Sequence, residues 1–67
     1  MAKNFGNNLK RERIAAGLTQ AELAAMVGVK QQQLSQWECD KVEPTLSNVV
    51  ALLKALHVGM EDLVDDL

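Results

Sequence analysis

The amino-acid sequence predicts an all-α fold in which five short helices pack as one compact, orthogonal domain. Apolar residues make up 48% of the 67 residues, yet only Phe5 and Trp37 are aromatic, so the core must be aliphatic. The single proline and the lack of any segment that reads as a strand favour helix. In segment 46–56 the apolar residues recur at the i, i+3, i+4, i+7 spacing of an amphipathic helix.

The first helix is expected over residues 5–16. Gly17 stands where this helix would end, and Leu18 follows as a hydrophobic anchor. A glycine at that point permits the left-handed conformation in which many helices end. The glycine therefore predicts where the first helix stops.

The second and third helices are expected over residues 20–27 and 31–38. The second opens with Thr19 and Glu22, which have the spacing of a capping box, so each side chain satisfies an otherwise unpaired amide at the helix start. Gly28 follows this helix, and a glycine there allows a positive φ and a sharp turn. Two short helices joined in this way form a helix-turn-helix pattern.

The fourth helix is expected over residues 46–56, with Thr45 as its cap and Pro44 blocking any extension backwards. His57 stands where this helix would end. Histidine is enriched in the left-handed conformation, so it fits such an end. A short fifth helix is expected over residues 60–64.

The five helices are too short to form bundle layers, so we expect them to share one core within a single domain spanning residues 1–67. The small side chain of Ala24 would let the third helix cross the second closely. Trp37 lies on an inward face and is expected to pack in the core rather than to stack on bases. The expected shared core contains Leu9, Leu23, Val27, Leu34, Leu46, Val50 and Leu53.

Charge is distributed unevenly along the chain, although the net charge is only −2. Residues 1–33 hold five basic and two acidic residues, whereas residues 34–67 hold two basic and seven acidic residues. This asymmetry permits a basic face and an acidic back. The alternative is a solvated surface with a chance imbalance.

Cysteine and histidine, which often carry catalysis or bind metals, occur only once each. Cys39 is the only cysteine and His57 the only histidine, and neither has partners at the spacing of a catalytic or metal site. We therefore expect no enzyme activity and no cofactor. The lone cysteine, with no apolar run of ~20 residues and no signal-like segment, leads us to expect a cytoplasmic protein.

The third helix is expected to present a polar face that carries Gln31, Gln32, Ser35 and Gln36. Glutamine offers a paired donor and acceptor that match N6 and N7 of adenine in the major groove of DNA. The alternative is that the glutamines are neutral helix filler. This alternative loses most of its weight because they follow a capped helix and a glycine turn at this spacing.

Arg13 and Glu38 both fall on otherwise apolar helix stripes. A buried, unpaired charge is costly, so we predict that the two side chains pair and tie the first helix to the end of the third. The alternative is that both side chains extend to solvent.

With these features together, the chain resembles the phage repressor and Cro-type helix-turn-helix family, often called XRE-like. The resemblance covers about Leu9 to Val64 through the segments GLTQAELAAMVGV, KQQQLSQWE, EPTLSNVVALLKAL and HVGMEDLV. It implies a lambda-repressor-like fold and sequence-specific binding of double-stranded DNA by a transcriptional repressor or regulator. The residues at the family's motif spacing are Gln20, Ala24, Gly28, Leu34 and Trp37.

The resemblance also implies roles for individual residues. Gln20 resembles the family's phosphate-contacting glutamine, while Gln31, Gln32 and Gln36 match positions that touch base edges. Arg13 and Glu38 match a structural ion pair. Lys30 replaces the usual Ser or Thr cap of the third helix and offers a phosphate contact. Lys41 offers a second phosphate contact.

Family members mostly bind pseudo-palindromic DNA sites as homodimers, often through the C-terminal helix. Here the four acidic residues after Gly59 would repel one another across such an interface, so we expect weak dimerisation that is completed on DNA. The apolar residues available in that region are Val58, Met60, Leu63, Val64 and Leu67.

The segment after the third helix departs from the family pattern. Asp40 and Glu43 stand where relatives often have Asn-Gly and basic residues, so we expect weaker DNA binding with a shallower salt dependence. The acidic C-terminal half also fits a different function, a protein-interaction module such as an antitoxin or an adaptor. A third possibility is that the chain is the N-terminal domain of a longer repressor.

Overall fold

The computed structural model describes residues 4–65, a range that contains five helices and no strand. The helices differ from the expected ranges by one residue, at the ends of the first and the fifth. The observed bounds are α1 Phe5–Ala15, α2 Gln20–Val27, α3 Gln31–Glu38, α4 Leu46–Leu56 and α5 Met60–Leu63.

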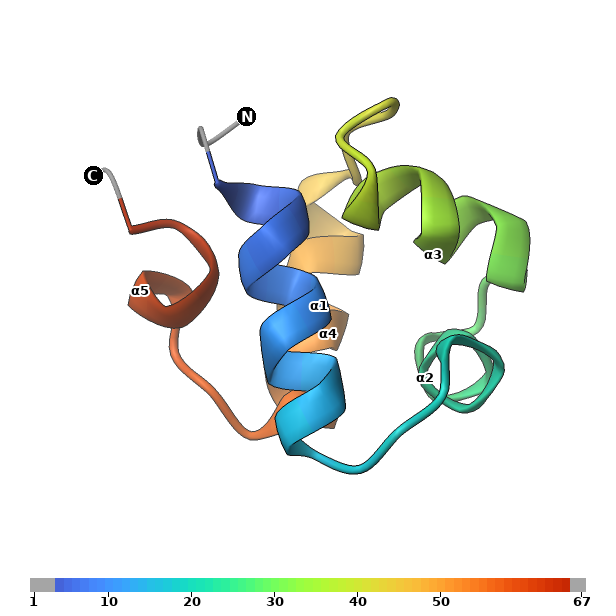
Figure 1. Ribbon diagram of the computed structural model, residues 1–67, viewed down its shortest axis with the longest axis horizontal. Coiled ribbons are helices and arrows are strands. Elements are labelled where there is room, and N and C mark those ends of the chain that lie inside the picture. The colour runs from blue at the N-terminus through green and yellow to red at the C-terminus, as the bar shows by residue number, and fades with distance from the viewer. Residues whose placement is uncertain (1–3, 66–67) are drawn as a thin grey trace.

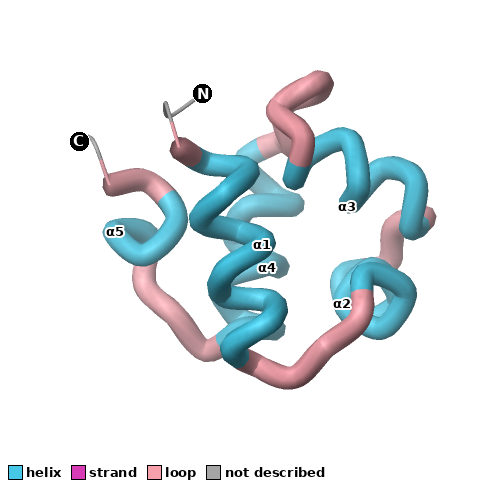
Figure 2. The backbone as a smooth tube through the Cα atoms, in the orientation of Figure 1, coloured by secondary structure: helices cyan, strands magenta, loops and turns pink. Residues whose placement is uncertain are grey.

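Helix α1 lies at the centre of the molecule (Figure 1). It packs against α3 on one side and α5 on the other, and α2 packs against α3 and α4. In the view of Figure 1, α4 lies behind α1, and α2 and α3 form one edge of the molecule. Short loops join the helices (Figure 2). The inner side of α3 packs against both α1 and α2.

Side-chain hydroxyls cap the starts of α2 and α4. The Glu22 amide donates to Thr19 Oγ1 over 3.1 Å, and the Thr19 amide donates to Glu22 Oε1 over 2.8 Å, which completes the capping box predicted from the sequence. At α4 the Asn48 amide donates to Thr45 Oγ1 over 3.2 Å. These contacts satisfy amides that have no partner within their own helix, so the starts of both helices are specified locally.

Left-handed residues end α1 and α4. Gly17 has a φ of 73°, and the amide of Leu18 donates back to the Arg13 carbonyl over 3.2 Å. At α4 the equivalent residue is His57, with a φ of 57°, and the Val58 amide donates to the Leu53 carbonyl over 3.1 Å. Both are Schellman-type ends, which satisfy the last carbonyls of the helix.

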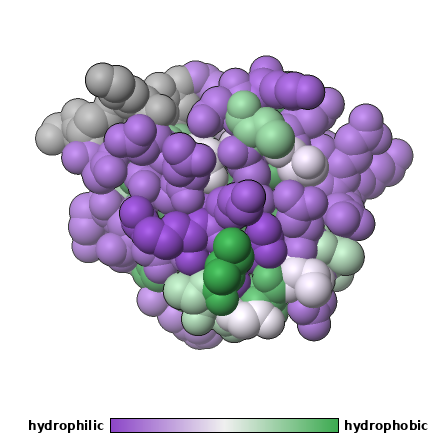
Figure 3. All heavy atoms as spheres, viewed as in Figure 1, coloured by the Kyte–Doolittle hydropathy of each residue, from purple (hydrophilic) through white to green (hydrophobic). Residues whose placement is uncertain are grey.

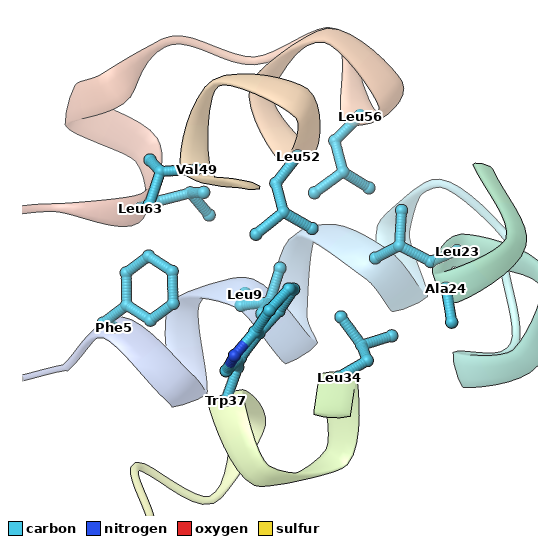
Figure 4. Packing of buried hydrophobic residues seen from close by; sticks show 10 residues of the cluster. All are labelled: Phe5, Leu9, Leu23, Ala24, Leu34, Trp37, Val49, Leu52, Leu56 and Leu63. Carbon is cyan, nitrogen blue, oxygen red and sulfur yellow. The ribbon is translucent and has the colours of Figure 1, made fainter. Parts of the chain in front are cut away.

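All five helices contribute to one apolar core (Figure 4). Leu9, Leu23 and Leu34 are buried as expected, and Trp37 is buried with them. Val27 and Leu53 are only partly buried and pack against the edge of this core. The remaining buried apolar residues are Phe5, Ala24, Val49, Leu52, Leu56 and Leu63.

The expectation that Leu46 and Val50 belong to the core is wrong. Leu46 is 72% exposed and Val50 is 40% exposed, and α4 turns Val49, Leu52 and Leu56 inward instead. The spacing rule failed because α4 is apolar on more than one face, so both sets of positions follow helical periodicity. Contact with the other helices selects the inner face, and the local sequence does not.

The buried face of α4 can be tested by truncation. Leu52→Ala removes a fully buried side chain and should lower the free energy of unfolding by about 2–5 kcal/mol. Val50→Ala, on the same helix, should change it by less than about 0.5 kcal/mol. Urea unfolding followed by circular dichroism measures both values. A larger loss for Val50→Ala than for Leu52→Ala would contradict the assignment.

Candidate nucleic-acid interface

The junction between α2 and α3 has the geometry of a helix-turn-helix. Gly28 has a φ of 81°, and the amides of Gly28 and Val29 both donate to the carbonyl of Ala24, over 2.9 and 3.0 Å. Ala24 and Leu34 are buried where α2 and α3 pack together. The small side chain of Ala24 permits this close crossing. The turn and the packing together fix the direction in which α3 leaves α2.

The three consecutive glutamines at the start of α3 do not share one role. All three are exposed, but Gln33 Oε1 accepts a hydrogen bond from the Lys30 amide over 3.0 Å. This contact is the half of a capping box that the third helical residue supplies, so Gln33 satisfies the Lys30 amide although the Lys30 side chain itself makes no cap bond. Gln31 and Gln32 have no such contact among the described residues. They are therefore the glutamines presented to solvent at the start of α3.

The other expected contact residues lie around this start. Ser35 and Gln36 are half-buried on the flank of α3, whereas Lys30 and Lys41 are exposed at its two ends. No side-chain hydrogen bond or ion pair within residues 4–65 occupies Lys30 or Lys41. The two lysines thus bracket the exposed glutamines with positive charge.

Glu38 and Arg13 form the ion pair expected from their positions on apolar stripes. Arg13 Nε donates to Glu38 Oε2 over 2.7 Å, and Arg13 Nη2 donates to Glu38 Oε1 over 3.2 Å. The two side chains are only 11% and 3% exposed, so neither extends to solvent. Arg13 Nη1 also donates to the Leu18 carbonyl over 2.9 Å. The guanidinium therefore joins α1, the loop before α2 and the end of α3.

Gln20 belongs to the same network. Its Nε2 donates to Glu38 Oε1 over 3.0 Å, and its side chain is half-buried. A glutamine amide has two N–H groups, so one remains free for a phosphate contact of the kind the family resemblance implies. The sequence did not reveal this inward contact, because nothing local links Gln20 to a carboxylate 18 residues away.

The capping carboxylate of α2 has a perturbed pKa. Hydrogen bonds from the Thr19 backbone amide and the Thr19 side chain lower the pKa of Glu22 below its ordinary value of 4.5. The folded state thus favours the charged carboxylate. The stabilisation from this cap is present above the ordinary pKa and is lost as the pH falls through the lowered pKa.

The C-terminal residues named for a dimer contact are mostly turned inward. Leu63 is fully buried, so it belongs to the core and cannot contact a partner. Val58, Met60 and Val64 are partly buried and pack against the same core, and Leu67 lies outside the described residues. The physical reason is that α5 has only one turn and must bury its apolar side against α1.

Exposed large apolar side chains lie elsewhere. The face shown in Figure 3 is mostly hydrophilic, with a small apolar area near its lower edge. Leu46 and Val50 are one helical turn apart on the outer side of α4, and Val42 lies in the loop that leads into this helix. The exposed large hydrophobic residues among residues 4–65 are Ile14, Met26, Val42, Leu46 and Val50.

Residues 4–65 contain no group of three or more His, Cys, Asp or Glu side chains arranged to hold a metal ion. None of their helices combines the length and apolarity that crossing a bilayer requires.

The capped α2, the glycine turn and the anchored α3 define a helix-turn-helix domain. A family model described as "Helix-turn-helix" matches residues 9–63, and the chain belongs to this family, whose fold is that of DNA-binding transcription regulators. The chain is 37% identical over 60 residues to repressor protein C2 of Salmonella phage P22, covering 90% of this chain but only 28% of that repressor. It is 41% identical over 64 residues to the uncharacterized HTH-type transcriptional regulator y4dJ of Sinorhizobium fredii, covering 96% of this chain and 83% of that protein.

Solved structures show the same fold. The crystal structure of the P22 c2 repressor in complex with a synthetic operator has a TM-score of 0.86 and 35% identity, covering 94% of this chain and 96% of that one. The solution structure of the P22 c2 DNA-binding domain also has a TM-score of 0.86 and 35% identity, covering 100% of this chain and 90% of that one. The crystal structure of the restriction-modification controller protein C.AhdI of Aeromonas hydrophila has a TM-score of 0.85 and 30% identity, covering 90% of this chain and 91% of that one. The all-helical, repressor-like fold expected from the sequence is therefore confirmed.

The buried ion pair yields a stability prediction. Arg13→Met leaves the Glu38 carboxylate buried without its charged partner and should lower the free energy of unfolding by about 3–5 kcal/mol. Lys10→Met, an exposed change of the same charge on the same helix, should change it by less than about 0.5 kcal/mol. Chemical unfolding of both variants measures the difference. Equal, small losses would show that the pair does not hold the helices together.

Proposed function

We propose that the chain binds double-stranded DNA sequence-specifically, with α3 in the major groove, and acts as a transcriptional repressor or regulator of phage or bacterial type. The observation that carries this proposal is that several side chains of α3 have a structural role and two glutamines do not. Gln33 caps the helix, Leu34 and Trp37 are buried, and Glu38 anchors the far end. Gln31 and Gln32 are left free on a rigidly held helix.

Each contact residue has a chemical role in this proposal. Gln31 and Gln32 read base edges through their paired amide groups, and Gln36 reads or supports from the flank, beside Ser35. Gln20, Lys30 and Lys41 contact phosphates and fix the register of the protein on the duplex. The chain is then a binding protein without enzyme activity that works in the cytoplasm, where bacterial and phage DNA is found.

Selection of duplexes from a random pool with the purified chain tests this function directly. A recovered consensus with two related half-sites supports the proposal. If no sequence is enriched while the chain captures a protein partner, the chain is an interaction module that uses the same fold without reading bases.

The two kinds of glutamine in α3 should respond differently to truncation. Gln32→Ala should weaken binding to the selected site by about 1–3 kcal/mol and relax the preference at one base pair, with little change in stability. Gln33→Ala removes the acceptor of the Lys30 amide, so it should lower stability by about 0.5–1 kcal/mol and leave the base preference unchanged. Binding and thermal unfolding measured on both variants decide this. The opposite pattern would contradict the assignment.

Lys30 should act on all sequences alike. Lys30→Ala removes one phosphate contact, so the slope of log K against log salt should fall by roughly 1 for specific and non-specific duplexes together. Titration of both duplexes at several salt concentrations measures the slope. A loss restricted to the selected sequence would mean that Lys30 touches bases.

We also propose that two copies of the chain bind adjacent half-sites and meet through the outer side of α4, where Leu46 and Val50 are exposed. The inward packing of Leu63, Met60 and Val64 leaves the C-terminal helix little apolar surface for a partner. Half-sites one turn apart place two recognition helices about 34 Å from each other.

A charge placed on this surface should disrupt the pairing. Leu46→Glu should weaken binding to a two-half-site duplex about tenfold, because burying a leucine side chain stabilises a contact by at least the free energy that corresponds to a tenfold change in affinity. Binding to a single half-site should be unchanged. Ile14→Glu is a matched control, because Ile14 is similarly exposed on α1. Duplex titration and sedimentation measure affinity and stoichiometry. If Ile14→Glu abolishes pairing and Leu46→Glu does not, the interface lies on α1.

A further inference from the structure

Asp40 occupies a backbone position that usually favours glycine. It follows α3 with a φ of 57°, its amide donates to the Trp37 carbonyl over 3.2 Å, and the Lys41 amide donates to the Gln36 carbonyl over 3.0 Å. This is a Schellman-type end in which the left-handed residue carries a side chain. Glycine is the residue most favoured at such an end, although aspartate tolerates the left-handed conformation, so the contacts of the Asp40 side chain show what the aspartate adds.

The carboxylate of Asp40 contacts the start of α1. Asp40 Oδ1 accepts a hydrogen bond from the Gly6 amide over 3.0 Å, across 34 residues of sequence. α1 lacks a cap of its own, because Asn4 makes no side-chain cap bond and its first turn contains no acidic residue. Asp40 therefore supplies both the missing acceptor and the missing negative charge at the N-terminus of α1.

Gly6 makes this contact possible because it has no side chain. It is buried, and a Cβ atom built there would lie 2.8 Å from Asp40 Oδ2 and 2.8 Å from the carbonyl carbon of Glu38, and closer still to the Glu38 carbonyl oxygen. Real Cβ atoms do not approach backbone so closely, so an alanine would push the end of α3 away from α1. The first turn of α1 and the last turn of α3 thus meet backbone against backbone.

We propose that Gly6 and Asp40 form a clasp that sets the direction of α3 for base reading, an inference that rests on the proposed DNA-binding function. Glu38 ties the end of α3 to Arg13 of α1 and to Gln20 of α2, and the contact between Asp40 and Gly6 adds a further tie to the first turn of α1. Gly6 and Arg13 lie seven residues apart on α1, a separation of about 10 Å along the helix. Ties that reach α1 at two points this far apart limit the rotation of α3 about either point.

This role reverses the effect expected of Asp40 from the sequence alone. If the carboxylate only repelled phosphate, its removal would strengthen binding to every duplex. If it is a positioning residue, removal of its acceptor should instead reduce the preference for the selected sequence. The two accounts therefore predict changes of opposite sign.

Three single substitutions separate the acceptor from the charge. Asp40→Asn keeps an oxygen acceptor and tolerates the left-handed conformation, whereas Asp40→Gly keeps the conformation and loses the acceptor. Asp65→Asn removes one negative charge at an exposed position after α5 and serves as the charge control. Glycine is favoured at this kind of helix end, so the Asp40→Gly chain is expected to fold.

The clasp itself is measured without DNA. Hydrogen exchange at the Gly6 amide, followed by NMR, should become about tenfold faster in Asp40→Gly and stay near the wild-type rate in Asp40→Asn and Asp65→Asn. Unchanged exchange in Asp40→Gly would overturn the clasp.

The positioning role is measured as the ratio of specific to non-specific affinity, well below the melting temperature. This ratio should fall about three- to tenfold in Asp40→Gly and be retained in Asp40→Asn. An equal gain for both duplexes in Asp40→Asn and Asp40→Gly would establish simple repulsion and overturn the proposal. A ratio near one for the wild-type chain would refute the proposed function and with it the positioning role. A wild-type preference that Asp40→Gly keeps would refute only the positioning role.

Discussion

The buried carboxylate of Glu38 is the interaction on which the arrangement of the first three helices depends. It accepts from Arg13 of α1 and from Gln20 of α2, so the two short helices of the motif and the central helix meet at one group. α2 and α3 have only eight residues each and would not be stable alone in water. A buried carboxylate strongly disfavours arrangements that leave it unpaired, so this network selects one orientation of α3.

The local cap at the start of α3 and the ties at its end explain why so few of its side chains are free. Its start is closed by Gln33 and its end by the ties to α1. A reading surface needs side chains held within a narrow range of positions, which a fixed helix provides and a mobile one does not. The presented surface is therefore small, and in the proposed function its specificity depends on the few side chains that these contacts leave unused.

Much of this architecture could be predicted because its determinants are local. The capping box of Thr19 and Glu22 and the turn at Gly28 depend on residues close together in sequence. The Arg13–Glu38 pair is not local, yet it could be predicted because two charges on apolar stripes have few other solutions. The proposed contacts of Gln31, Gln32 and the lysines with DNA rest on exposure and family membership.

The features that the sequence did not reveal depend on tertiary contacts. α4 is apolar around most of its circumference, so only packing shows that Leu52 faces inward and Leu46 outward. From the sequence alone, Leu63 is expected to be available for a dimer contact because it is an apolar residue near the C-terminus. The single turn of α5 buries it in the core instead. The contact between Gly6 and Asp40 joins residues 34 apart and has no sequence pattern of its own.

Several of the acidic residues that give the chain its negative net charge have a structural role at the starts of helices. Glu22 caps α2, Asp62 Oδ2 accepts from the Gly59 amide at the start of α5, and Asp40 accepts from α1, so these carboxylates lie at helix N-termini. Negative charge is favourable there because it opposes the positive end of the helix dipole. α3 is arranged differently, with no acid in its first turn and Lys30 at its start. The helix dipole and Lys30 therefore both place positive charge at the end that carries Gln31 and Gln32, which supports the proposed contact with a phosphate backbone despite the net charge of −2.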